Sequence, residues 1–163
     1  MPIKCRSLKA IVDEHAQGGA APLDLPGYAV TTLGKLPGIE LASDFIICDP
    51  DTQQAYNDFL YTECPAAKPL WTVFAASGQG DFWLLGRTEN QIGYYEHNDE
   101  NLSLETIKNM AISLENWVML ADIIHQLEDK MEIADPSPKD EKETVQALSS
   151  LGIDLNKLPF SYF

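Results

Sequence analysis

Three apolar runs of strand length, separated only by short turns, dominate the middle of the chain. They read LWTVFAAS (residues 70–77), DFWLLGR (81–87) and QIGYYEH (91–97), and the segments between them are GQG and TEN. Runs at this spacing are typical of strands that pair with their chain neighbours through hairpins. The sequence therefore predicts an antiparallel meander at the centre of the fold.

Within this meander, the segment DFWLLGR shows alternation between two faces. Phe82 and Leu84 fall on one face, and Trp83 and Leu85 fall on the other, so apolar side chains would cover both sides of the sheet. The core is the expected place for Trp83, and a binding pocket is the alternative.

The turn before this strand contains Gly78 and Gly80, followed by Asp81. A phosphate-binding loop would continue into Lys and Ser or Thr at the start of a helix, whereas an apolar strand follows here. The glycines are therefore interpreted as turn residues that need positive φ.

Helical periodicity flanks the meander on both sides. Residues 5–16 place apolar side chains on one stripe, and a second helix is expected after the turn Asp49-Pro50-Asp51, which itself follows an apolar strand over 45–48. From residue 104 to residue 131, apolar side chains recur every three or four positions, a spacing that would allow one long helix. Ser113 can serve as an N-cap, and we favour a short strand before it and a helix from Leu114.

The remaining segments are rich in Pro and Gly or in charge. Residues 20–42 are expected to be loop with short extended pieces, and ADPSPKDEKE (134–143) is interpreted as a charged linker before a small helix that ends at Gly152. We expect one domain over residues 1–133, with residues 134–163 forming a linker and a short helix that docks on it.

The charge balance restricts the kind of partner. The chain has 163 residues, of which 25 are Asp or Glu and 11 are Lys or Arg, for a formal net charge of −14. Such a field repels nucleic acid and anionic membranes, and it steers basic proteins toward the surface. The alternative is that the acidity serves solubility. With no apolar run of signal-peptide or membrane-spanning length, a cytoplasmic location is expected.

No catalytic, metal or cofactor motif stands out. The spacing of Asp49 and Asp51 resembles a calcium loop, but Gln54 and Leu60 occupy the positions that need Gly and Glu. The group around His97 is better interpreted as a solvated strand end than as a metal site. The three cysteines form no CxxC and are expected to be reduced and buried. We therefore expect no enzymatic activity, no cofactor and no metal.

The order of these elements resembles the SUKH superfamily, whose best-known eukaryotic branch is the Smi/Knr cell-wall regulators. The likeness covers residues 70–131, and the segment from Ala134 lies outside it. It rests on a Gly-rich turn that runs into an acid and an aromatic strand, on a following strand with a polar and acidic end, and on an Ala-x-Ser before an aromatic helix. The matching residues are Gly80, Asp81 and Trp83, then Tyr94 to Asp99, then Ala111, Ser113 and Trp117.

The resemblance implies an α+β domain that has a central antiparallel sheet, with helices packed mainly on one side, and that binds instead of catalysing. Bacterial members act largely as immunity proteins that neutralise secreted toxins, including nucleases. A toxin-neutralising protein with a basic protein partner, acting as a monomer or weak dimer, is the first expectation. An intracellular regulatory or scaffold domain is the alternative. The expected partner-binding residues are Asp81, Trp83, Glu96, Asp99 and Glu100, with a solvated loop as the alternative for the last three.

Overall fold

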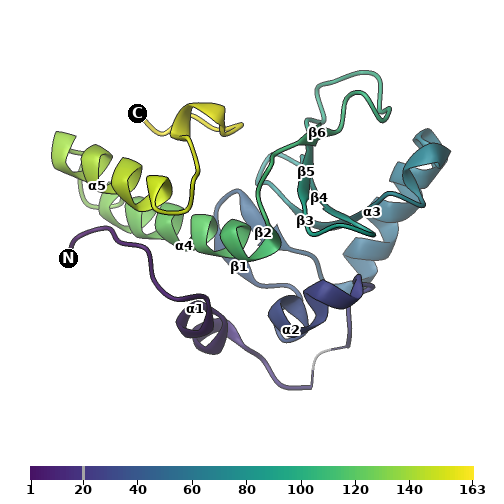
Figure 1. Ribbon diagram of the computed structural model, residues 1–163, viewed down its shortest axis with the longest axis horizontal. Helices are drawn as coiled ribbons and strands as arrows, with labels where there is room; N and C mark the ends of the chain where they lie inside the picture. The colour runs from purple at the N-terminus through teal and green to yellow at the C-terminus, as the bar shows by residue number, and fades with distance from the viewer. Residues whose placement is uncertain (20) are drawn as a thin grey trace.

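The computed structural model describes residues 1–19 and 21–163 and contains one six-stranded sheet flanked by helices (Figure 1). Every strand pairs antiparallel with its neighbour in the chain, in the order β1-β2-β3-β4-β5-β6. The strands are β1 (Glu40–Ala42), β2 (Phe45–Ile47), β3 (Trp71–Ala76), β4 (Phe82–Gly86), β5 (Ile92–Tyr95) and β6 (Lys108–Asn109). The α-helices are α1 (Leu8–His15), α2 (Val30–Leu33), α3 (Pro50–Glu63), α4 (Leu114–Met131) and α5 (Pro138–Ser149). The predicted α+β class with a central antiparallel sheet is confirmed.

The sheet separates two hydrophobic clusters, as the alternation in β4 predicts. Trp83 and Leu85 belong to the larger cluster, and Phe82 and Leu84 belong to the smaller one on the opposite face. All of β3, β4 and β5 is buried, since both faces are covered.

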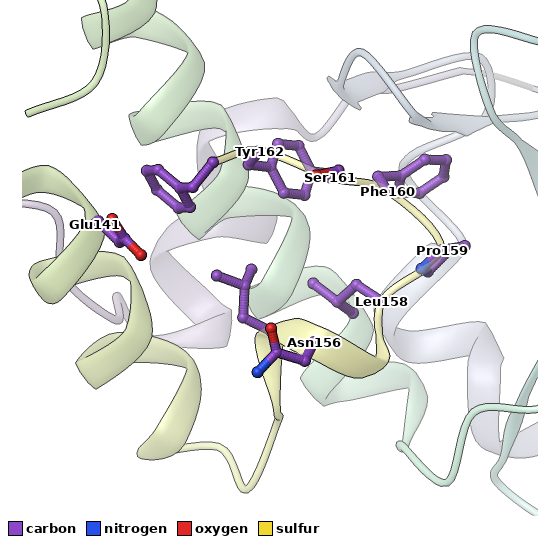
Figure 2. A pocket seen from close by; sticks show the side chains of 9 residues that line it. Glu141, Asn156, Leu158, Pro159, Phe160, Ser161 and Tyr162 are labelled. Carbon is purple, nitrogen blue, oxygen red and sulfur yellow. The ribbon is translucent and has the colours of Figure 1, made fainter.

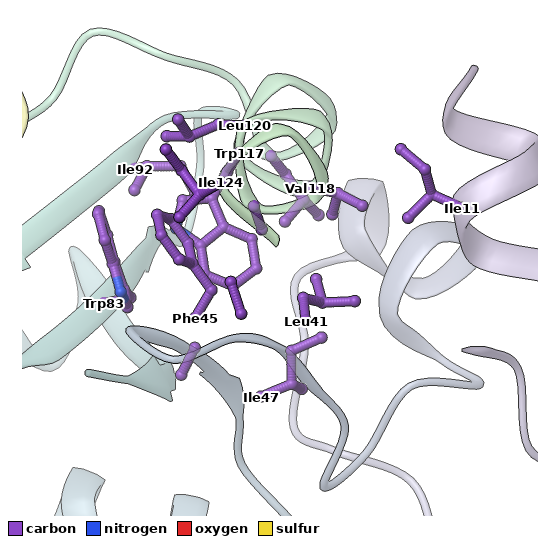
Figure 3. Packing of buried hydrophobic residues seen from close by; sticks show 14 of the residues in the cluster. Ile11, Leu41, Phe45, Ile47, Trp83, Ile92, Trp117, Val118, Leu120 and Ile124 are labelled. Atoms are coloured by element: carbon purple, nitrogen blue, oxygen red, sulfur yellow. The ribbon is translucent and has the colours of Figure 1, made fainter. Parts of the chain in front are cut away.

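Helix α4 covers the larger cluster, and its Trp117 is the contact between helix and sheet (Figure 3). The ring of Trp117 lies 4.7 Å from Phe74, 5.4 Å from Phe45 and 5.7 Å from Trp83, measured between centroids. The helix begins where the sequence predicts, because the hydroxyl of Ser113 accepts a hydrogen bond from the backbone N–H of Asn116 at 3.1 Å.

Helix α3 covers the opposite face of the sheet. Asp49 caps it by accepting from the backbone N–H of Thr52 at 2.8 Å, and Pro50 occupies the first turn. Asn57 is buried and forms a polar tie to the sheet, since its side-chain oxygen accepts from the N–H of Val73 at 2.8 Å. Helices α1, α2 and α4 and the end of α5 contribute to the first cluster, whereas α3 and the 3₁₀ turn Pro65–Ala67 after it cover the second.

Two Pro-rich segments are more ordered than the sequence suggests. The segment expected to be loop from residue 20 contains a 3₁₀ turn at Gly27–Ala29, helix α2 and strand β1, while Ala20 itself lies outside the described residues. The prediction of a linker over residues 134–143 is wrong for the second half of that segment, because α5 begins at Pro138. A capping box between Ser137 and Asp140 starts this helix.

The segment after α5 returns to the body of the domain. The Phe160 ring lies 6.1 Å from Trp83, 6.1 Å from Phe45 and 5.8 Å from Tyr94, measured between centroids. These contacts extend the aromatic core across the sheet face beside α4. A shallow hollow of about 350 Å³ remains between this segment and Glu141 of α5 (Figure 2).

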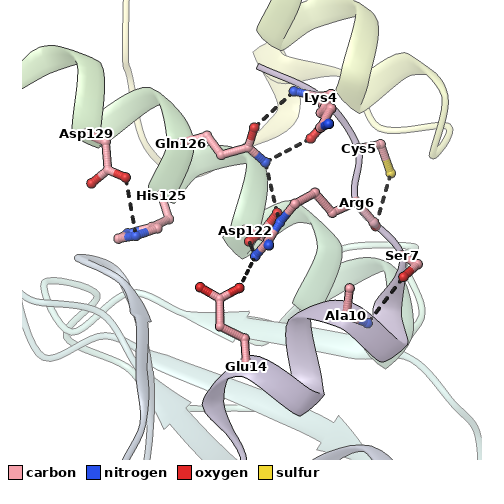
Figure 4. Close-up of polar contacts among 10 residues, drawn as sticks. All are labelled: Lys4, Cys5, Arg6, Ser7, Ala10, Glu14, Asp122, His125, Gln126 and Asp129. Carbon is pink, nitrogen blue, oxygen red and sulfur yellow. Dashed lines mark hydrogen bonds and ion pairs between the residues drawn. The ribbon is translucent and has the colours of Figure 1, made fainter. Parts of the chain in front are cut away.

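A network of polar contacts fastens the first residues of the chain to α4 (Figure 4). The guanidinium of Arg6 donates to both carboxylate oxygens of Asp122, at 3.0 and 2.7 Å, and the Asp122 side chain is only 2% exposed. The amide of Gln126 exchanges two hydrogen bonds with the backbone of Lys4, at 3.0 and 2.8 Å. Two parallel charge-assisted bonds fix direction as well as distance.

We expect Arg6→Ala to lower the free energy of unfolding by about 3 kcal/mol, because it leaves the buried Asp122 carboxylate without its cation. Chemical denaturation at neutral pH measures the change. Lys4→Ala is the matched control, since Lys4 contacts α4 through its backbone. Equal effects of the two substitutions would contradict a role for the ion pair.

Candidate functional site

Asp81 is the centre of a polar cluster at the end of the sheet where the β3–β4 turn meets the end of β5. Its carboxylate accepts hydrogen bonds from the hydroxyl of Ser77 at 3.0 Å, from the hydroxyl of Tyr94, and from the backbone N–H of His97 at 2.9 Å. The Nδ1 atom of His97 lies 2.5 Å from the same carboxylate. Asp81 thus joins the β3–β4 turn to the end of β5 and the residues that follow it.

The turn that carries Asp81 is shaped by its glycines. Gly80 has a φ of +90°, which L-residues with a side chain rarely adopt. A side chain at Gly78 would meet the carbonyl oxygen of Ser43 at 3.0 Å, and the Gly78 N–H donates to the side chain of Asp44 at 3.1 Å. The β1–β2 turn therefore lies directly beside the β3–β4 turn.

The charge state of Asp81 follows from its surroundings. Burial alone would raise its pKa, but hydrogen bonds from Tyr94, His97 and Ser77 stabilise the carboxylate more strongly and hold the pKa below the ordinary value of 3.8. Burial and the bond to Asp81 raise the pKa of the Tyr94 hydroxyl, so Tyr94 remains a donor at neutral pH. Asp81 is a buried anion whose lone pairs are well occupied.

The segment after β5 presents the acids predicted as partner-binding residues. Glu96, Asp99 and Glu100 are all exposed. The hydroxyl of Tyr95 donates to the Asp99 carbonyl at 2.6 Å, which holds the turn against the end of the sheet. We call residues 96–100 the acidic loop.

The chain beyond the acidic loop returns to the core. Leu102 and Ile107 are buried in the smaller cluster beneath α3. The pKa of Tyr95 is raised first by burial and then by the charges of Asp99 and of Glu63, the last residue of α3. The negative end of the α3 dipole adds to this field.

An exposed aromatic side chain belongs to the same region. Phe59 on α3 is 50% exposed and packs edge-on against Phe82, with 6.1 Å between centroids. Phe82 in turn lies 6.1 Å from the ring of Tyr95, whose hydroxyl reaches the acidic loop. Aromatic contacts thus run from the exposed Phe59 through Phe82 to Tyr95, the side chain that holds the acidic loop.

The structure separates the five predicted residues into two groups. Trp83 is fully buried and donates from its indole nitrogen to the Asp44 carbonyl at 2.8 Å, so it belongs to the core and presents no surface to a partner. Asp81 is 3% exposed and acts inside the domain. The three acids of the loop are the predicted residues that remain at the surface. Glu63 and Phe59 were missed, because their proximity to the loop depends on the packing of α3.

The side chains around Asp81 include one imidazole. The His97 side chain is 44% exposed, and its Nδ1 is committed to Asp81. Among the described residues, no group of three or more His, Cys, Asp or Glu side chains converges as metal ligands would. Cys48 is buried beside the sheet, and burial raises the pKa of its thiol to about 12, so it is no thiolate nucleophile at neutral pH.

Comparisons with protein-family models, with curated proteins and with solved structures find no match to this chain. No helix among residues 1–19 and 21–163 combines the length and apolarity needed to cross a bilayer.

We expect Asp81→Asn to lower the free energy of unfolding by about 1–3 kcal/mol at pH 7, because it weakens several bonds to a buried carboxylate. The folded-state pKa of Asp81 is depressed, so its stabilising contribution is present above the ordinary pKa and is lost as the pH falls through the lower, folded-state value. The stability difference between the two proteins should therefore shrink as the solution is acidified below about pH 4. Denaturation curves across this range measure it.

Asp135→Asn serves as the control, since Asp135 is exposed and outside the cluster. A difference between wild type and Asp81→Asn that stays constant through the acid range would show that the Asp81 charge does not stabilise the fold.

Proposed function

We propose that this chain is a non-enzymatic, cytoplasmic protein-binding domain that neutralises a basic protein toxin, such as a nuclease, by direct contact through the acidic loop. The observation that carries the proposal is the group formed by Glu96, Asp99 and Glu100, exposed together on a loop whose two ends are anchored in the domain. The protein acts as a monomer or weak dimer.

Charge supports a basic partner at two scales. The whole chain carries a net charge of −14, which accelerates the approach of a basic protein from solution. At short range, the acidic loop and Glu63 concentrate negative charge at one end of the sheet. Complementary charge of this kind raises association rates and rejects acidic competitors.

Phe59 supports binding beyond electrostatic attraction. Interfaces are typically anchored by aromatic side chains at their centre and surrounded by a polar rim. Phe59 supplies an exposed aromatic that is supported from behind by Phe82 and lies one helical turn before Glu63. Burying it against a partner would add a hydrophobic contribution that salt does not screen.

Asp81 supports a preorganised loop. It holds the N–H and the ring of His97, so the first residues of the acidic loop are fixed before a partner arrives. Prior ordering reduces the conformational entropy lost on binding. In this proposal Asp81 is a positioning residue, and the exposed acids make the contacts.

The test is a pull-down from the native cell type with the tagged protein, at low and high salt, followed by association kinetics with the retained protein. We expect one basic partner that is released at high salt. Replacing Glu96, Asp99 and Glu100 together by Lys should slow association at low salt by about tenfold or more, because it reverses the local charge.

The matched control replaces Glu40, Glu132 and Asp135 by Lys, which changes the net charge equally at exposed positions away from the acidic loop. If both triple variants slow association equally, the effect comes from net charge, and the acidic loop does not lie in the interface. If the pull-down retains only housekeeping or cell-envelope proteins, and salt does not release them, the regulatory or scaffold function is favoured instead.

A further inference from the structure

A polar cleft lies beside α3 and includes the residue that follows β4. It has a volume of about 450 Å³, within the range of sites that bind small molecules. The segment before α2, helix α3, the turn after it and the end of β4 all contribute to its walls. The charged side chains of its lining are Asp24, Asp58, Lys68 and Arg87, and Tyr61 lies among them.

Two cations share one aromatic side chain in this cleft. The Nζ atom of Lys68 lies 5.9 Å from the ring centroid of Tyr61, and the Cζ atom of Arg87 lies 5.7 Å from the same centroid. Within the described part of the chain, neither Lys68 nor Arg87 forms an ion pair, although the protein carries a large excess of acids. The cleft therefore holds two cations that have no ion-pair partner among the described residues of an acidic protein.

The guanidinium of Arg87 is held in place with a donor to spare. Its Nη2 donates to the hydroxyl of Tyr61 at 2.5 Å, and that hydroxyl donates to the carbonyl of Trp71 at 2.8 Å. The Nε atom of Arg87 is buried and has no acceptor among residues 1–19 and 21–163. Because that atom is buried, a ligand in the cleft would meet the Nη atoms instead, and Nη1 forms no hydrogen bond with the described residues, so it is free to donate to an oxyanion.

Two carboxylates belong to the same cleft. Asp24 and Asp58 line it, and the Asp24 backbone is fixed by two hydrogen bonds with the Gln53 side chain, both of 2.8 Å. These carboxylates would repel a bare anion, but they would accept hydrogen bonds from hydroxyl or ammonium groups. The cleft is therefore bipolar, with two cations and two acids.

We propose that this cleft binds a small organic phosphate whose other end carries an amino or hydroxyl group. Arg87 presents a planar fork to the phosphate oxygens, and Lys68 adds a mobile point charge. Two cations match the charge of a phosphate monoester better than that of a single carboxylate. Asp24 and Asp58 receive the donor groups at the other end of the ligand.

The test is an NMR titration of the full chain at constant ionic strength with three probes: phosphoethanolamine, inorganic phosphate and ethanolamine. We expect phosphoethanolamine to bind most tightly, inorganic phosphate to bind at millimolar concentrations, and ethanolamine to bind least. The resonances that shift should be those of residues lining the cleft, including the amides of Lys68 and Arg87.

Three substitutions separate the roles. Lys68→Gln lies at an exposed position and should weaken the binding of both phosphates by about threefold, and Arg87→Gln should weaken it by about tenfold or more. Asp58→Asn should weaken phosphoethanolamine and leave inorganic phosphate unchanged or slightly tighter. Lys108→Gln, an exposed lysine outside the cleft, should change neither.

Failure of inorganic phosphate and phosphoethanolamine to bind the wild-type protein would overturn the proposal. So would equal affinities in the wild type, Lys68→Gln and Lys108→Gln, or shifts confined to other surfaces. The Lys68→Gln variant keeps Arg87 and its packing. If Arg87→Gln fails to fold, the phosphate affinity of Lys68→Gln therefore still tests the proposal.

Discussion

The contact of Trp117 with the sheet is the interaction on which the rest of the domain depends. Trp117 is fully buried in the first turn of α4 and meets Phe45, Phe74 and Trp83, which come from three different strands. A helix attached at this point fixes the position of the sheet, of α1 and of α5, since all of them border the same cluster. Aromatic side chains of this size contribute both area and defined geometry.

The opposite face of the sheet depends on polar ties as much as on apolar packing. Gln53 and Asn57 on α3 are buried and bind the backbone of β3, so the helix is held in register along the strand. That register determines which α3 side chains reach the surface at either end. Phe59 packs against Phe82, which contacts the ring of Tyr95 at the acidic loop, and Tyr61 lies in the polar cleft. One helix therefore contributes to both surfaces to which we assign binding.

Local sequence rules predicted the elements whose signals are local. The meander, the caps at Asp49 and Ser113 and the alternation around Trp83 each need only a few neighbouring residues to recognise. The start of α5 also has a local signal, the capping box at Ser137, but the surrounding Pro and charge obscured it. The helical turns and the strand within residues 21–42 are too short to show a periodic pattern of apolar residues, so the sequence did not indicate them.

The sites were harder to predict, because their contacts join distant segments. Asp81 follows a turn glycine and looks like a surface acid, yet Tyr94 and His97 enclose it from another strand. Likewise, Tyr61, Lys68 and Arg87 show no motif, and only the packing of α3 against β3 brings them together. Sequence spacing located the acids of the loop, because exposed acids need no tertiary contact to remain at the surface.

The strictly sequential strand order also determines how another chain can approach. The two edges of the sheet are β1, which has three residues, and β6, which has two. Beyond β6 the chain turns away at Ala111, whose φ is +56°, and enters α4. Edges this short expose few unpaired backbone groups and give little template for an added strand. We therefore expect recognition of this protein to rely on its side chains, and the described strands leave intermolecular sheet growth no extended edge on which to begin.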